Sequence, residues 1–245
     1  MNIVIFSGTT EGRMLSHALA QRGIPVTVSV ATEYGREEQG ECDGVTVSCG
    51  RKTVEEMRDM LHGAALCVDA THPYAVEVTQ NMREACTQAG VPYRRLLRAA
   101  SETMSDCILV ESAAAAAQWL ASREGNVLLT TGAKELAAFA PLGGERLYPR
   151  VLPVQSSLDG CLRAGIPHRN IIAMQGPFSE ELNLALLHQF AIRWMVSKDG
   201  GATGGFPEKA RAAQHAGVPM VVIARPEEQG ADFAAILQEC EERMR

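Results

Sequence analysis

Short apolar runs alternate with amphipathic helical segments along almost the whole of this 245-residue chain. Each apolar run has the length of a strand, and most are followed by a polar loop and then by apolar residues at helical spacing. A strand, a helix and a second strand in this order form a parallel pair, because the helix returns the chain to the same end of the sheet. The alternation therefore predicts an α/β fold in which mainly parallel sheets carry helices on both faces.

A small and polar segment, residues 99–106, separates two stretches in which this alternation is regular. We interpret it as a linker between two Rossmann-like domains, residues 1–98 and residues 107–245. Two such domains usually face each other across a central cleft, with the carboxyl ends of their strands toward it. Functional residues are therefore expected in the loops that follow strands.

Glycine and proline mark many of the predicted boundaries, because glycine caps helices and proline cannot continue them. The predicted strands are residues 2–6, 25–30, 44–48, 66–69, 93–96, 107–110, 126–129, 146–148, 171–174, 193–196 and 219–224. The predicted helices are residues 11–22, 53–62, 74–89, 112–122, 133–139, 154–164, 179–189, 207–216 and 232–243.

Composition excludes several classes of function. The net charge of −6 argues against a general nucleic-acid-binding protein. The apolar runs are shorter than the roughly 18 residues of a membrane span, and the N-terminus does not resemble a signal peptide. The seven cysteines include no CxxC pair, so we expect free thiols in a reducing cytoplasm and no metal site.

The loop after the first predicted strand, residues 7–13, reads Ser-Gly-Thr-Thr-Glu-Gly-Arg. Backbone N–H groups at such a turn, together with the positive end of the helix dipole, favour phosphate. The dinucleotide fingerprint GxGxxG is matched only in part, because Thr10 replaces the middle glycine. The loop predicts a nucleotide cofactor, and a plain strand–helix turn is the alternative.

The end of the second predicted strand indicates which nucleotide is preferred. NAD-specific sites usually place an acidic residue here, next to the ribose 2′-hydroxyl. Residues 28–32 read Val-Ser-Val-Ala-Thr and contain none. Nearby Arg36, or Arg51 with Lys52, would tolerate a 2′-phosphate, so the sequence favours NADPH.

Polar residues also follow the fourth predicted strand, where residues 69–75 read Asp-Ala-Thr-His-Pro-Tyr-Ala. His72 and Tyr74 flank a proline at a helix start, and a histidine there can donate a proton or bind a carboxylate. The alternative is that His72 only packs at the helix end. Three arginines close the first half, either as carboxylate ligands or as a solvated charge run: Arg94, Arg95 and Arg98.

Two loops of the second half also suit an anionic ligand. Residues 130–135 repeat the order strand, hydroxyls, glycine, helix, and they place Lys134 in a first helical turn, where a cation is unfavourable. A solvated lysine is the alternative there. Residues 197–209 combine several glycines with Lys198 and Lys209, and such a loop suits phosphate or carboxylate.

Taken together, five of these segments resemble the precorrin-6A reductase / cobalt-precorrin-6A reductase family of cobalamin biosynthesis. They are residues 8–13, 28–35, 69–75, 131–136 and 197–209. The resemblance implies reduction of a double bond in a corrin-pathway macrocycle, from (cobalt-)precorrin-6A to (cobalt-)precorrin-6B, by hydride transfer from NADPH. It also implies a polycarboxylate substrate and allows other corrin-pathway enzymes as partners. Any cobalt would arrive within the substrate.

The resemblance also assigns roles to residues. His72 and Tyr74 become the catalytic candidates. Cofactor binding is assigned to Gly8, Thr9, Thr10, Glu11, Gly12, Arg13, Ser29 and Thr32. Substrate binding is assigned to Thr131, Gly132, Lys134, Ser197, Lys198, Thr203, Gly204 and Lys209.

Other classes of protein match less well. No tyrosine is followed by lysine four residues later, as a short-chain dehydrogenase requires. The first loop lacks the acidic character expected of a methyltransferase. A two-domain sensor that binds a small anion without turnover stays open as a non-enzymatic alternative.

Overall fold

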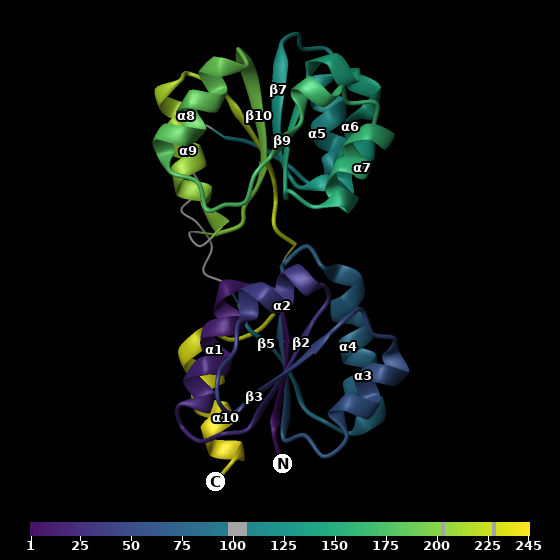
Figure 1. The fold of residues 1–245 in the computed structure, drawn as a ribbon, viewed down its shortest axis with the longest axis vertical. Coiled ribbons are helices and arrows are strands. Elements are labelled where there is room, and N and C mark those ends of the chain that lie inside the picture. Colours follow the sequence, from purple (N-terminus) through teal and green to yellow (C-terminus); the bar gives the residue numbers. More distant parts are fainter. Residues whose placement is uncertain (98–106, 202–203, 227–228) are drawn as a thin grey trace. The chain divides into compact units, whose positions relative to one another are not determined.

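The computed structural model describes residues 1–97, 107–201, 204–226 and 229–245. The chain divides into two compact units (Figure 1). Unit 1 comprises Met1–Ala99 and Pro226–Arg245, and unit 2 comprises Ala100–Arg225. The predicted linker, residues 99–106, lies outside the described residues.

Unit 1 is built on a parallel sheet of five strands in the order β3-β2-β1-β4-β5. The strands are β1 (Ile3–Ser7), β2 (Val26–Val30), β3 (Val45–Cys49), β4 (Leu66–Ala70) and β5 (Tyr93–Arg95). The central strands β1 and β4 are buried along their whole length. The chain leaves them in opposite directions across the sheet, so the switch point that usually binds ligands lies between them.

Helices cover both faces of this sheet. They are α1 (Thr10–Ala20), α2 (Glu33–Gln39), α3 (Val54–Leu61), α4 (Val76–Ala89) and α10 (Phe233–Arg243). Helices α1 and α10 lie on one face, and α3 and α4 lie on the other (Figure 1). Each face encloses its own apolar core, which explains why the strands are apolar without alternation.

The C-terminal helix α10 belongs to unit 1, which corrects the predicted boundary of the second domain at residue 245. Ile236 and Cys240 are fully buried in the core that α1 forms with the first sheet. The Leu97 N–H donates to the Ala231 carbonyl at 2.8 Å, at the edge of the sheet beside β5. The helical pattern of residues 232–243 fits either sheet, because amphipathicity does not specify which apolar surface a helix covers.

Unit 2 is built on a parallel sheet of six strands in the order β6-β11-β10-β7-β8-β9. The strands are β6 (Ile108–Val110), β7 (Asn126–Thr130), β8 (Leu147–Val151), β9 (Ile172–Ala173), β10 (Ile192–Lys198) and β11 (Met220–Ile223). Its switch point lies between β7 and β10, because β7 leads toward β8 and β10 leads toward β11.

The helices of unit 2 again occupy two layers. They are α5 (Ala113–Leu120), α6 (Leu136–Phe139), α7 (Gln155–Arg163), α8 (Glu180–Gln189) and α9 (Phe206–His215). Helices α8 and α9 cover one face, and α5, α6 and α7 cover the other (Figure 1). Short 3₁₀ turns complete the unit: η1 (Ala133–Glu135), η2 (Ala140–Leu142), η3 (Gly144–Arg146) and η4 (His168–Asn170).

The predicted α/β fold with two mainly parallel sheets is confirmed, and every predicted strand is present within the described residues. Two helical predictions were wrong in detail. Helix α2 was not expected, and the segment predicted as one helix over 133–139 is a 3₁₀ turn followed by one turn of α-helix. The predicted cleft concerns the placement of one unit against the other and stays a prediction. None of the described helices has the length and apolar character needed to span a membrane.

Candidate nucleotide and substrate sites

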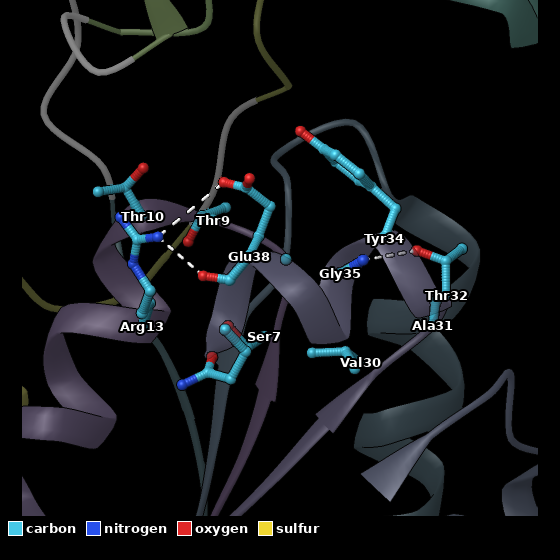
Figure 2. Close-up of a pocket in the computed structure, with 12 residues that line it drawn as sticks. Ser7, Thr9, Thr10, Arg13, Val30, Ala31, Thr32, Tyr34, Gly35 and Glu38 are labelled. Atoms are coloured by element: carbon cyan, nitrogen blue, oxygen red, sulfur yellow. Dashed lines mark hydrogen bonds and ion pairs between the residues drawn. The ribbon is translucent and has the colours of Figure 1, made fainter. Parts of the chain in front are cut away.

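A pocket of about 310 Å³ lies at the carboxyl ends of β1 and β2 in unit 1 (Figure 2). The loop after β1 and the first turn of α1 form one wall, and helix α2 forms another. The pocket is lined by Ser7, Gly8, Thr9, Thr10, Arg13, Val30, Ala31, Thr32, Tyr34, Gly35, Glu38 and Gln39.

Thr9 fixes the start of helix α1 in this wall. Its Oγ1 accepts a hydrogen bond from the Gly12 N–H at 3.2 Å and donates one to the Ala70 carbonyl at 2.9 Å. The N-terminus of α1 is therefore tied to the end of β4. The first N–H groups of a helix have no partner within the helix and point out of its end, where they attract anions.

The two glycines of this loop have different structural roles. A Cβ at Gly12 would lie 2.6 Å from Ser7 Oγ and 2.8 Å from Ala70 Cβ, so glycine is needed for α1 to approach β1 and β4. A Cβ at Gly8 would meet no atom within 4 Å. Because Gly8 lines the pocket, a side chain there would take up space that a ligand needs.

Helix α2, which the sequence analysis missed, supplies Tyr34, Gly35, Glu38 and Gln39 to the pocket. The signal was Thr32, whose Oγ1 caps the helix by accepting from the Gly35 N–H at 3.0 Å. Few apolar residues and an internal glycine hid the helical pattern of this segment.

The two helices that line the pocket are held together by polar contacts. Gln39 is buried and donates to Ser16 Oγ at 2.8 Å, and Ser16 Oγ donates to the Arg13 carbonyl at 2.8 Å. Arg13 Nη1 donates to the Glu38 carbonyl at 2.8 Å and lies 3.9 Å from its carboxylate (Figure 2). Arg13 thus places a positive charge in the wall, close to the helix terminus. The pKa of Tyr34 is raised by burial and by the charge of Glu38, so its hydroxyl stays protonated.

The structure brings most of the predicted cofactor residues together. Gly8, Thr9, Thr10, Arg13 and Thr32 line the pocket. The other three predicted residues do not line it: Glu11, Gly12 and Ser29. Gly12 acts in helix packing, and Ser29 is buried within β2.

The loop after β4 is organised by a buried carboxylate, Asp69. Asp69 accepts hydrogen bonds from the Thr71 N–H and hydroxyl at 3.0 and 2.7 Å, from the Thr79 hydroxyl at 2.7 Å and from the Tyr93 hydroxyl at 2.9 Å. Arg95 completes the network with an ion pair of 2.5 Å and is only 2% exposed. The proposed role of Arg95 as a substrate clamp was therefore wrong, because Asp69 already occupies its guanidinium.

The two catalytic candidates lie next to this network. The His72 Nδ1 accepts a hydrogen bond from the Tyr74 N–H at 3.4 Å, and the two rings are 5.4 Å apart. Both residues are half-buried. The loop thus places them together at the carboxyl end of β4, beside the switch point of unit 1.

In unit 2, an ion pair joins the end of β10 to the 3₁₀ turn η1 that follows β7. Lys198 Nζ lies 2.5 Å from Glu135 Oε1. Thr131 is buried, and its hydroxyl forms no hydrogen bond with the described residues. These loops flank the switch point of the second sheet, so the structure gathers predicted substrate residues at the place where such sheets bind ligands.

The other predicted substrate residues differ in their surroundings. Lys134 is exposed, and Gly132 has a φ of 82° at the start of η1. Ser197 is fully buried and donates to the Lys198 carbonyl at 3.1 Å, and the Gly204 N–H donates to the Gly201 carbonyl at 3.1 Å. Thr203 lies outside the described residues.

Lys209 is buried in the first half of helix α9. Its pKa is lowered to about 8 by burial and then by the charge of Arg150, although Asp199 and Glu208 act in the opposite direction. Burial also lowers the pKa of Arg150 to about 10. The sequence analysis missed Arg150, because this residue lies just beyond the predicted strand 146–148 and belongs to no motif.

Comparison with known proteins agrees with this arrangement. The family profile described as "Precorrin-6x reductase CbiJ/CobK" matches residues 2–241. The chain belongs to this family. Precorrin-6x reductases that resemble it include the "Cobalt-precorrin-6A reductase" of Priestia megaterium, with 36% identity over 91% of this chain and 90% of the relative. The protein of the same name from Salmonella typhimurium is also 36% identical, over 92% of this chain and 88% of the relative.

A solved structure, "CobK precorrin-6A reductase", has a TM-score of 0.79 to this chain. It covers 99% of this chain and 97% of its own, with 23% sequence identity. At this identity the likeness shows the shared fold, and it confirms the two-sheet α/β architecture.

Proposed function

We propose that this protein reduces cobalt-precorrin-6A or precorrin-6A to the corresponding precorrin-6B, with NADPH as the hydride donor. Membership of the precorrin-6x reductase family and the names of its relatives support the substrate. The observation that carries the cofactor assignment is the pocket at the N-terminus of α1 (Figure 2). Its open glycine, helix N-terminus and arginine suit a diphosphate.

The residues of this pocket fit NADPH in distinct ways. The diphosphate would lie against Gly8 and the first turn of α1, where the space beside the Gly8 Cα is open. Arg13 adds a charge-assisted donor close by. Thr32 and Tyr34 would hold the ribose and adenine, since they form the wall at the end of β2. The absence of an acidic residue from residues 28–32 favours NADPH over NADH.

The bound coenzyme supplies the hydride, and the protein supplies orientation and a proton. We assign the proton to His72, with Tyr74 beside it, because both side chains lie at the end of β4 next to the proposed nicotinamide position. The buried Asp69 network holds this loop in one conformation. A fixed loop keeps the donor aligned with the reacting carbon.

Unit 2 is proposed to bind the carboxylate-rich macrocycle. The residues assigned to it are Thr131, Gly132, Lys134, Ser197, Lys198, Gly204 and Lys209, with Thr203 kept from the sequence. Other enzymes of the corrin pathway are possible partners. No disulfide joins any of the seven cysteines within the described residues, which supports a cytoplasmic location as part of this proposal.

The test is an anaerobic assay of NADPH oxidation with cobalt-precorrin-6A, together with equilibrium binding of NADPH and NADH. In Gly8→Ala we expect NADPH binding to weaken by about tenfold or more, because the new methyl group enters the pocket while the fold has room for it. Gly160→Ala is the control for adding a methyl group at a glycine outside the pocket. Gly160 lies in α7, and a Cβ there would come no closer than 3.5 Å to another atom.

Two outcomes would contradict the proposal. Undiminished NADPH binding by Gly8→Ala would place the coenzyme elsewhere. Stabilisation of the protein by the macrocycle without any NADPH oxidation would favour the non-catalytic sensor instead.

A further inference from the structure

Two cationic side chains are buried in unit 2, and no carboxylate of the described residues forms an ion pair with either of them. Lys209 is 8% exposed and Arg150 is 7% exposed. Lys209 forms no hydrogen bond and no ion pair with the described residues. Arg150 is bonded to Asn183 of α8, and α8 packs in one apolar core with α9, which carries Lys209. Burial lowers the pKa of Lys209, and the charge of Arg150 lowers it further. Burying like charges together is unfavourable unless an anion compensates for it.

The two carboxylates whose charges act on Lys209, Asp199 and Glu208, are engaged elsewhere. Asp199 accepts from the Gly201 N–H at 3.0 Å and lies 3.8 Å from the Arg225 guanidinium. Glu208 accepts from Arg211 at 3.1 Å. Their charges raise the pKa of Lys209 without forming a contact with it. The ammonium group is therefore left available for a ligand.

Arg150 is held in place by neutral groups. It donates to the Asn183 Oδ1 at 2.7 Å, and its guanidinium lies 4.0 Å from the centre of the Phe178 ring. Asn183 is fully buried and is itself fixed through bonds to the Phe178 and Ser179 carbonyls. An arginine positioned in this way presents its planar donors in a fixed orientation, and such donors match a carboxylate.

Both residues lie near the ligand-binding end of the second sheet. Arg150 is the next-to-last residue of β8, and Lys209 lies in the N-terminal half of α9. Side chains of a helix tilt toward its N-terminus, so Lys209 extends toward the carboxyl ends of the strands. Gly205 begins α9 without a side-chain cap from the described part of the chain, and the helix dipole adds positive potential there.

We propose that Arg150 and Lys209 together bind one carboxylate group of the macrocyclic substrate. This inference rests on the proposed function, which supplies a polycarboxylate. One carboxylate would accept from the Lys209 ammonium and from the free side of the Arg150 guanidinium, and its charge would offset both cations. Arg150 is thereby added to the substrate site, and Lys209 receives a specific role in it.

The experiment compares Lys209→Met and Arg150→Met with wild type and with Arg193→Met. Arg193 is an exposed cation at the opposite end of the second sheet, so its variant controls for the loss of one positive charge. The measurements are the KM for cobalt-precorrin-6A, the Kd of this macrocycle without NADPH, and the Kd of NADPH. Loss of a charge-assisted bond should raise the macrocycle KM and Kd by about 10- to 100-fold in both site variants. NADPH binding should change by less than about twofold, since its proposed pocket lies in unit 1.

Arg150→Lys gives a second test of how Arg150 contributes to macrocycle binding if Arg150→Met does not fold. It keeps the charge and loses the planar donors, so we expect a smaller rise in KM than for Arg150→Met. Wild-type macrocycle affinity in Lys209→Met, with the protein folded, would overturn the carboxylate site. Macrocycle binding that depends on both cations without NADPH oxidation would support the site and refute the proposed reductase activity. If wild type does not bind the macrocycle at all, both proposals fail.

Discussion

Replacing Lys209 by methionine should stabilise the free protein, although it removes a residue of the proposed substrate site. The pKa of Lys209 is lowered from its ordinary value of 10.5 to about 8. Each pKa unit corresponds to about 1.4 kcal/mol, so the charged lysine costs the folded state about 3 kcal/mol at neutral pH. Methionine keeps most of the apolar stem and carries no charge. We therefore expect Lys209→Met to raise the free energy of unfolding at pH 7 by up to about 3 kcal/mol.

The gain should depend on pH with a defined sign. Between pH 8 and pH 10.5 the unfolded chain keeps a proton on Lys209 that the folded chain has already released, so wild-type stability increases with pH through this group. The advantage of Lys209→Met should then shrink to about half of its neutral-pH value by about pH 9.5.

Tryptophan fluorescence in a urea titration is a suitable measurement, because both tryptophans, Trp119 and Trp194, lie in unit 2. The control is Lys134→Met, an exposed lysine of the same unit, for which we expect a change within about 0.5 kcal/mol at every pH. A Lys209→Met variant that is less stable than wild type at pH 7, or whose advantage does not change with pH, would refute the reasoning.

Three further predictions follow from particular contacts. Lys198→Met should lower the stability of unit 2 by about 1–3 kcal/mol in the same urea titration, because Glu135 then loses its partner; unchanged stability would contradict this. Gly12→Ala should lower the thermal stability of unit 1 by about 1–3 kcal/mol, measured by calorimetry, whereas Gly8→Ala should not. His72→Ala should lower kcat for cobalt-precorrin-6A by about a hundredfold with NADPH affinity unchanged, and full turnover would remove His72 from the mechanism.

Local sequence patterns were enough to predict the fold class, the strands and the loop after β1 that lines the pocket of unit 1. A buried strand such as β1 is recognised from consecutive apolar residues, and the helix after it from Thr9 and the apolar spacing that follows. These signals depend on neighbours within a few residues, so they can be recognised without knowledge of the tertiary structure. The same local pattern singled out Gly8, Thr10 and Arg13, which line the pocket of unit 1.

Other features depend on contacts between distant parts of the chain. Arg95 and Asp69 form a buried ion pair across two strands, although the arginine seemed suited to bind substrate. Helix α10 packs in unit 1 because it covers an apolar surface on α1, which lies more than 200 residues earlier in the chain. Arg150 is a candidate ligand because the fold buries it and pairs it with the neutral Asn183 of α8, a contact that spans 33 residues of the chain.

The sequence by itself determined what each segment becomes, because periodicity, capping and turn residues act over one or two helical turns. The tertiary structure decided which charges are neutralised and which are left for a ligand. That outcome depends on burial and on partners from other elements. Lys198, at the end of β10, pairs with Glu135, whereas Lys209, in α9, is buried with no ion pair to a carboxylate of the described residues.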